Sequence, residues 1–174
     1  MSHAYERRTS NLLGALALAL ADEMQAVAAA VAGHGASGPA ALVLLADLAG
    51  GATVEEQRRA LGLTHSGTVR LVDRLVGAGL VERRVGADAR SLSLHLTPGG
   101  GRTARRVITA RDGVLERALI PLEPRQRVLF EGLLEQLVAG LEEPRRRICR
   151  LCDVPACGRC PAQAKPSSRG SESG

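Results

Sequence analysis

The chain has 174 residues, 45% of them hydrophobic, which suits a globular protein with its own core and excludes a wholly disordered chain. Its net charge is +5, and all but one of its 23 basic residues are arginine, the side chain suited to bidentate contact with phosphate and guanine. Aromatic residues make up only 1%, which nearly excludes single-strand binding by base stacking but leaves duplex binding through charge open.

The first element is a helix over about residues 5–32, rich in Ala and Leu at helical spacing and ended by the glycines at 33 and 35. Its longest uncharged apolar run, residues 12–21, stops at Asp22 and Glu23 and is too short to span a bilayer. A basic leader with a cleavage site is also missing from this region. We therefore expect a cytoplasmic protein with no membrane partner.

Two short helices follow a second helix that begins at Pro39 and ends near residue 50. Thr53 and Glu56 form a capping box that opens the first of them, and Gly62 closes it. Thr64 caps the next helix, which runs to about residue 76. On a helical wheel, this helix has one side that packs against the protein and an opposite side that is free to contact DNA. The packing side holds Thr68, Leu71, Val72 and Leu75, and the other side holds Ser66, Gly67, Arg70, Asp73 and Arg74.

The period then changes from helical to two, because leucines at 92, 94 and 96 alternate with polar residues. We predict a hairpin in which residues 81–85 pair with this strand and residues 86–90 form the tip. Two helices joined at a glycine turn and followed by a two-stranded ribbon describe a winged helix-turn-helix, which places its second helix in a DNA major groove.

Two more helices are expected at residues 98–119 and from Pro124 until Pro144 ends the second. Gly99 to Gly101 weaken the start of the helix at residues 98–119 by up to about 1 kcal/mol per glycine relative to alanine. This stretch is either a hinge or a poor helix start. The second carries an apolar stripe, listed here: Val128, Leu134, Leu137, Val138 and Leu141. Long aliphatic helices at both ends of the chain cannot easily be buried in a monomer, so we expect a homodimer that reads a pseudo-palindromic site.

All four cysteines lie in the pattern C-x2-C-x4-C-x2-C, at Cys149, Cys152, Cys157 and Cys160. Four thiolates are the ligands of a tetrahedral zinc or an iron–sulfur cluster, and the spacing does not separate the two. In a cytoplasmic protein the pattern favours metal over disulfides, with reversible thiol oxidation or a passive tail as the alternatives. We expect the neighbouring arginines to lower the thiol pKa values.

Enzymatic activity is not expected. His65 and Ser66 are adjacent, but neighbouring helix residues point about 100° apart. The chain has no nucleophile elbow, phosphate loop or H-E-x-x-H motif.

Residues 61–100 resemble the core of the MarR family of bacterial transcriptional regulators. The resemblance rests on four motifs in order: R-L-V-D-R-L at 70–75, G-L-V-E-R at 79–83, D-x-R at Asp88 and Arg90, and L-T-x-x-G at 96–100. With the flanking helices it covers about residues 5–142 and leaves out the cysteines. It implies a winged-helix homodimer whose first and last helices interlock, with small ligands bound between the dimerisation and DNA-binding regions.

The resemblance also implies roles for single residues. Arg90 would enter the minor groove from the wing tip, as the groove's negative potential favours, and Asp88 would hold a wing arginine. Arg70 and Arg74 would belong to the recognition helix, where Val69 replaces a more usual small polar residue. The expected DNA-binding residues are Thr64, Ser66, Gly67, Arg70, Arg74, Arg84, Asp88 and Arg90.

The expected fold class is therefore mainly α with a small β-hairpin wing. The expected units are an N-terminal dimerisation helix (1–36), a winged helix-turn-helix (37–97), C-terminal dimerisation helices (98–147), the cysteine cluster (148–161) and a disordered tail (162–174). The expected function is a dimeric repressor of transcription whose cysteines respond to metal, an iron–sulfur cluster or redox state. The alternative is a metal- or thiol-buffering protein that uses its winged helix for protein partners.

Overall fold

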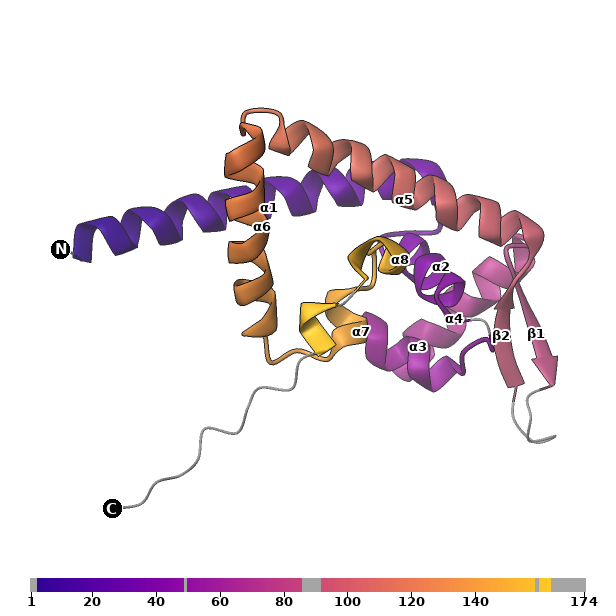
Figure 1. Ribbon diagram of the computed structural model, residues 1–174. Coiled ribbons are helices and arrows are strands. Elements are labelled where there is room, and N and C mark those ends of the chain that lie inside the picture. Colours follow the sequence, from indigo (N-terminus) through magenta and orange to yellow (C-terminus); the bar gives the residue numbers. More distant parts are fainter. Residues whose placement is uncertain (1–2, 49, 86–91, 159, 164–174) are drawn as a thin grey trace, which may run out of the picture.

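The computed structural model describes residues 3–48, 50–85, 92–158 and 160–163, and helices make up most of this part of the chain (Figure 1). The elements are α1 (His3–Ala32), α2 (Gly38–Ala46), α3 (Val54–Leu61), α4 (His65–Gly77), β1 (Val81–Val85), β2 (Leu92–Leu96), α5 (Pro98–Leu119), α6 (Pro124–Ala139), α7 (Arg145–Ile148), α8 (Val154–Cys157) and the 3-10 helix η1 (Pro161–Gln163). The predicted fold class, mainly helical with a two-stranded hairpin, is confirmed.

Local sequence signals set the bounds of α3 and α4. In the capping box, Glu56 N–H donates to Thr53 Oγ1 over 3.1 Å, and Thr53 N–H donates to Glu56 Oε2 over 2.8 Å. Gly62 closes α3 in the left-handed conformation at φ 65°, which glycine adopts without strain. Thr64 then caps α4 by accepting from Gly67 N–H over 3.1 Å. Both caps are as predicted.

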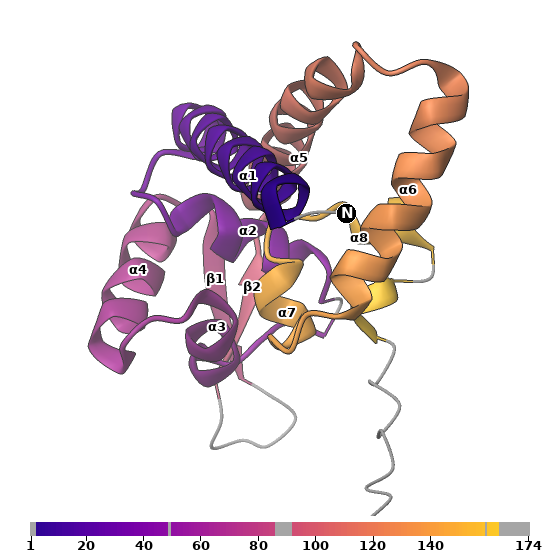
Figure 2. The same cartoon turned by 90° about the vertical axis from the view of Figure 1, so that its left-hand side faces the viewer.

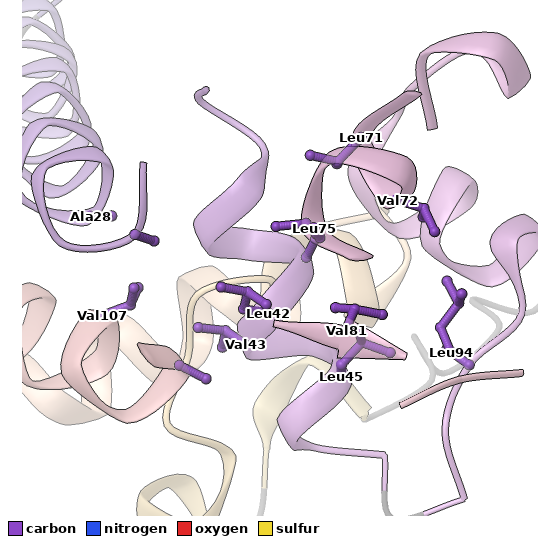
Figure 3. Packing of buried hydrophobic residues seen from close by; sticks show 14 residues of the cluster. Ala28, Leu42, Val43, Leu45, Leu71, Val72, Leu75, Val81, Leu94 and Val107 are labelled. Atoms are coloured by element: carbon purple, nitrogen blue, oxygen red, sulfur yellow. The ribbon is translucent and has the colours of Figure 1, made fainter. Parts of the chain in front are cut away.

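The core lies where α2, α4, the hairpin and the inner part of α1 and α5 meet (Figure 3). Leu42 of α2 and Leu71 and Leu75 of α4 are almost fully buried, and Val107 of α5 packs into the same cluster. These side chains are aliphatic, as the composition requires, and they fix α4 on the body of the domain. The face of α4 opposite to them is left exposed.

The hairpin pairs β1 and β2 antiparallel, with Val81 opposite Leu96 and Val85 opposite Leu92. Ala52, ahead of α3, bridges to Leu94, which is buried. Leu92 is 55% exposed, so the predicted apolar face of this strand is covered only at the end nearest the core. The predicted tip, residues 86–90, lies outside the described residues.

Gly100 has a role that helix propensity did not reveal. A Cβ at this position would lie 1.9 Å from the carbonyl oxygen of Leu80, whereas at Gly99 and Gly101 the nearest atoms would be 3.5 and 3.8 Å away. The first turn of α5 therefore packs directly on the backbone that enters β1. This packing is a reason for glycine at position 100 that the prediction of a hinge or a poor helix start does not include, because a side chain there would collide with that backbone.

The two long terminal helices extend beyond the core. The inner end of α1 packs on α5, while its outer half projects from the body, and α6 runs from the end of α5 as a separate arm (Figures 1 and 2). Every residue of α6 is at least partly exposed. By length and composition residues 6–32 could cross a membrane, with a hydropathy of 1.5, so the shorter run considered from the sequence understated this helix. One such helix is weak evidence for a membrane span.

The C-terminal part differs from expectation in two places. The last long helix ends at Ala139, before Gly140, rather than continuing to Pro144. Beyond it the chain forms α7, α8 and η1, so Ala162 and Gln163 belong to a 3-10 helix rather than to the expected disordered tail. The remainder of that tail, from residue 164, lies outside the described residues.

Candidate DNA-binding surface and cysteine segment

The exposed face of α4 is the one that the helical wheel predicts. Ser66, Arg70, Asp73 and Arg74 are exposed, while Thr68, Leu71, Val72 and Leu75 are buried. Arg70 and Arg74 are four residues apart and therefore lie one turn apart on the same side. Two guanidinium groups on the protruding second helix of a helix-turn-helix are well suited to reach guanine edges or phosphates.

The N-terminal turn of α4 gathers the three smaller predicted residues. Thr64 and Ser66 are exposed, with their hydroxyl oxygens 3.5 Å apart, and Thr64 accepts the cap hydrogen bond from the backbone of Gly67. A Cβ at Gly67 would lie only 3.0 Å from Thr64 Oγ1. The missing side chain thus protects the cap as well as leaving the backbone open to a groove.

An ion pair joins α4 to the hairpin, and the sequence did not predict it. Arg83 Nη2 donates to Asp73 Oδ1 over 2.6 Å, with the two side chains 35% and 55% exposed. The helical wheel places Asp73 on the exposed face of α4 and gives it no partner. Its position one turn from Arg70, together with an arginine in β1, is the signal that could have indicated this tie.

The wing residues are only partly described. Arg84 is exposed on β1, and its Nε donates to Glu82 Oε1 over 2.7 Å on the same strand. A surface pair of this kind is weak, so it can open when a phosphate competes. Asp88 and Arg90 lie outside the described residues, and their expected roles remain predictions.

The four cysteines lie in a segment that we call the cysteine segment, residues 145–163. All four thiols are free, and the sulfurs of Cys149 and Cys160 are 3.8 Å apart. A zinc ion about 2.3 Å from each of four thiolates would place any two sulfurs about 3.8 Å apart, so this pair matches one edge of such a site. Within the described residues, however, no three His, Cys, Asp or Glu side chains form a metal-binding group.

Burial raises the pKa values of two of the four thiols, and hydrogen bonds lower that of a third. Burial and the thiols of Cys152 and Cys160 raise the pKa of Cys149 to about 12. Burial also raises the pKa of Cys152. At Cys160 burial is outweighed by hydrogen bonds from the backbone of Ala162, from Cys149 and from Arg145, so its pKa is lowered. The expected lowering is therefore wrong for Cys149 and Cys152.

The cysteine segment closes over α2 and α5 and leaves two hollows. One, of about 300 Å³, lies between α2 and the segment, and Val43, Asp47, Cys149 and Cys152 are among its lining. The other, of about 430 Å³, shares three of these residues and extends along α5 to Ile108. Both are open to solvent and of a size that admits a small molecule.

The α3–turn–α4 unit with its hairpin defines the class: the domain is a winged helix-turn-helix. Residues 34–91 match the model of the MarR family. This match confirms the family resemblance, over a shorter stretch than the sequence motifs and flanking helices suggested.

Solved structures share the fold over most of the chain. A MarR family protein from Bacillus stearothermophilus is 26% identical, with 79% of this chain and 95% of that chain covered and a TM-score of 0.68. RV1404 from Mycobacterium tuberculosis is 27% identical, with 80% and 92% covered and a TM-score of 0.60. CouR from Rhodococcus jostii RHA1, solved bound to p-coumaroyl-CoA, is 21% identical, with 78% and 97% covered and a TM-score of 0.58. No curated protein sequence matched this chain.

Proposed function

We propose that the protein is a sequence-specific regulator of transcription that binds duplex DNA as a homodimer and acts as a repressor by occupying its operator. The observation that carries this proposal is the exposed face of α4, which presents Arg70 and Arg74 while its other face is fixed in the core. The match of residues 34–91 to the MarR family model and the net charge of +5 support the same function. A role as regulator rather than enzyme accords with the similarity to MarR family proteins.

A homodimer would bury the apolar surface that a single chain leaves exposed. On α1, Leu12, Leu13, Leu16 and Leu18 are between 44% and 69% exposed. On α6 the exposed apolar residues include most of the predicted stripe and two further leucines: Val128, Leu129, Leu133, Leu134, Leu137 and, just beyond the helix, Leu141. Surfaces of this extent usually mark an interface. Their coverage by a second copy would also account for the hydropathy of α1 in a cytoplasmic protein.

The cysteine segment is proposed to hold a metal ion through Cys149, Cys152, Cys157 and Cys160. The distance between the Cys149 and Cys160 sulfurs supports an ion shared by these two thiolates, and the spacing of the motif adds the other two. In an iron–sulfur cluster with four irons each thiolate would bind a different iron, which sets the sulfurs farther apart. The distance between the two sulfurs therefore disfavours a four-iron cluster, but it fits zinc and also a two-iron cluster, in which two thiolates share each iron. Zinc is the proposed ion, with the cluster and the reversible thiol switch as alternatives.

A small-molecule effector is also proposed, in the hollows beside α2 and α5. The structure of CouR with p-coumaroyl-CoA supports ligand binding in a protein of this fold. In this chain the cysteine segment forms one wall of both hollows. An effector bound there would therefore touch the segment as well as the helices that carry the DNA-binding unit.

The test is the binding of duplex DNA at several salt concentrations, with sedimentation of free and bound protein. A regulator of this kind gives two chains per duplex and an affinity whose logarithm falls linearly with the logarithm of salt, at about −0.9 for each phosphate contacted. Absence of salt-dependent retention would favour the alternative, a metal- or thiol-buffering protein whose winged helix binds proteins. A reporter under the operator decides between repression and activation.

A further inference from the structure

The cysteine segment packs against the helix-turn-helix of its own subunit. In both views α7 lies beside α3, and the contacts between the two helices agree (Figures 1 and 2). In the chain the segment directly follows α6, one of the helices that we assign to the dimer interface. The fold instead carries the segment back onto the DNA-binding unit.

Two arginines of α7 reach the two ends of α3. Arg146 Nη1 lies 3.1 Å from Glu56 Oε1, in the first turn of α3. Arg147 places its guanidinium 3.5 Å from where a Cβ of Gly62 would be, at the residue that closes α3 and begins the turn into α4. Since α3 is the first helix of the helix-turn-helix, α7 spans this helix from its start to the turn.

The carboxylate of Glu56 takes part in two contacts at the start of α3: the capping box with Thr53 and the ion pair with Arg146. Its Oε2 accepts from the backbone N–H and the hydroxyl of Thr53, over 2.8 and 3.1 Å, while its Oε1 faces Arg146. These hydrogen bonds and Arg146 all lower the pKa of Glu56, so it carries its charge at neutral pH. The position of α7 is thereby linked to the cap that fixes where α3 begins.

The segment is also anchored on its other side. Leu151 packs against the hydrophobic core, and Cys149 and Cys152 face Val43 of α2 across the smaller hollow. Yet α7 has only four residues, too few to be stable alone, and its ion pair with Glu56 is about half exposed and therefore weak. A stable brace requires that the loop from Cys149 to Cys160 be closed by something stronger than these contacts.

We propose that the cysteine segment is an intrachain brace: with its thiolates joined by a metal ion, α7 holds α3 at both ends and so sets the position of the recognition helix within one subunit. This inference rests on the proposed function, because it uses both DNA binding and a metal at the cysteines. It adds the route by which the metal affects DNA binding. The signal reaches α4 through α3 and leaves the dimer interface unchanged.

The experiment compares zinc-loaded and chelator-treated full-length protein, by hydrogen exchange of the α3 amides and by operator affinity at fixed salt. In the parent, zinc slows exchange in α3 and tightens operator binding by roughly 5- to 150-fold, the usual range of coupling between two sites. Arg146→Ala reduces this ratio by about two- to fivefold, as loss of an exposed ion pair would. Its zinc content should stay that of the parent.

Glu56→Gln is the sharper variant. Glutamine at this position still completes a capping box, so α3 folds, while the charge that faces Arg146 is lost. It should reduce the zinc effect as Arg146→Ala does. Arg150→Ala is the matched control, since Arg150 donates to the carbonyl oxygen of Arg147 inside the segment, and it should keep the parental ratio.

The outcomes separate the brace from the function on which it rests. Failure to bind any duplex would overturn the proposed regulator, and failure to bind zinc would overturn the metal site together with the brace. If the parent binds both, an α3 exchange rate unchanged by zinc overturns the brace alone. A full zinc effect in both Arg146→Ala and Glu56→Gln does so too, as does a zinc effect that appears only as a change in dimerisation.

Discussion

Alanine substitution of Gly100 and of Gly101, in the first turn of α5, should have opposite effects on stability. Gly100→Ala is the perturbing change, because its Cβ would lie 1.9 Å from the Leu80 carbonyl oxygen and 3.1 Å from Leu96 Cδ2. That oxygen also accepts a hydrogen bond from Thr97 N–H over 3.1 Å. The chain entering β1 must therefore move, and the link between the hairpin and α5 is strained with it.

The magnitude follows from three contributions. Overpacking costs about 1–3 kcal/mol. Weakening the Thr97 hydrogen bond adds about 0.5–1.5 kcal/mol. The gain in helix propensity from glycine to alanine returns up to about 1 kcal/mol. With the full 1 kcal/mol returned, we expect Gly100→Ala to lower the free energy of unfolding by about 0.5–3.5 kcal/mol. Gly101→Ala, with nothing closer than 3.8 Å, should raise it by up to about 1 kcal/mol.

The assay is denaturant unfolding of the parent and both variants at one protein concentration, because dimerisation makes stability depend on concentration. Circular dichroism and operator binding follow the same samples. The reasoning fails if Gly100→Ala is as stable as Gly101→Ala. It fails equally if both variants are destabilised alike, since the distinction rests on the Leu80 backbone at one position only.

Four further results are expected. Arg70→Ala or Arg74→Ala should weaken specific binding by about 1–3 kcal/mol in a titration at fixed salt, and parental affinity in both variants would mean that α4 is not the reading helix. Arg90→Ala should weaken DNA binding with the dimer intact by light scattering, so loss of the dimer would show a structural role instead. Replacing Cys149 alone should release bound metal nearly as completely as replacing all four cysteines, and partial occupancy by elemental analysis would refute a single shared site. Glu55 has a pKa of about 2 in the folded chain, from hydrogen bonds with two arginines, against an ordinary value of 4.5. Its contribution to stability is therefore present above about 4.5 and is lost as the pH falls toward 2, so Glu55→Gln should flatten the decline of stability in that range, and an unchanged pH profile would contradict the assignment.

The parts of the fold that the sequence predicts well are those with local signals. The Thr53–Glu56 capping box and the left-handed Gly62 are set by residues three to nine positions apart, and both stand as expected. The buried and exposed sides of α4 follow from the helical period in the same way. Such features need no knowledge of the rest of the chain.

Contacts between segments far apart in the chain could not be predicted from such local signals. Arg146 and Glu56 are 90 positions apart, and a run of arginines has no period that points to α3. Gly100 looked like a weak helix start because its reason lies in the Leu80 backbone, twenty residues earlier. The arginines beside the cysteines suggested lower thiol pKa values, but burial depends on the packing of the whole segment and raises two of them.

The central claim, that α4 reads a sequence in duplex DNA, is tested most directly by selecting binding sites from a random duplex library with the purified protein. The account predicts a pseudo-palindrome with half-sites about one helical turn apart, bound about 10³-fold or more tightly than random duplex at physiological salt. Enrichment of no common sequence, with equal affinity for every duplex, would contradict it.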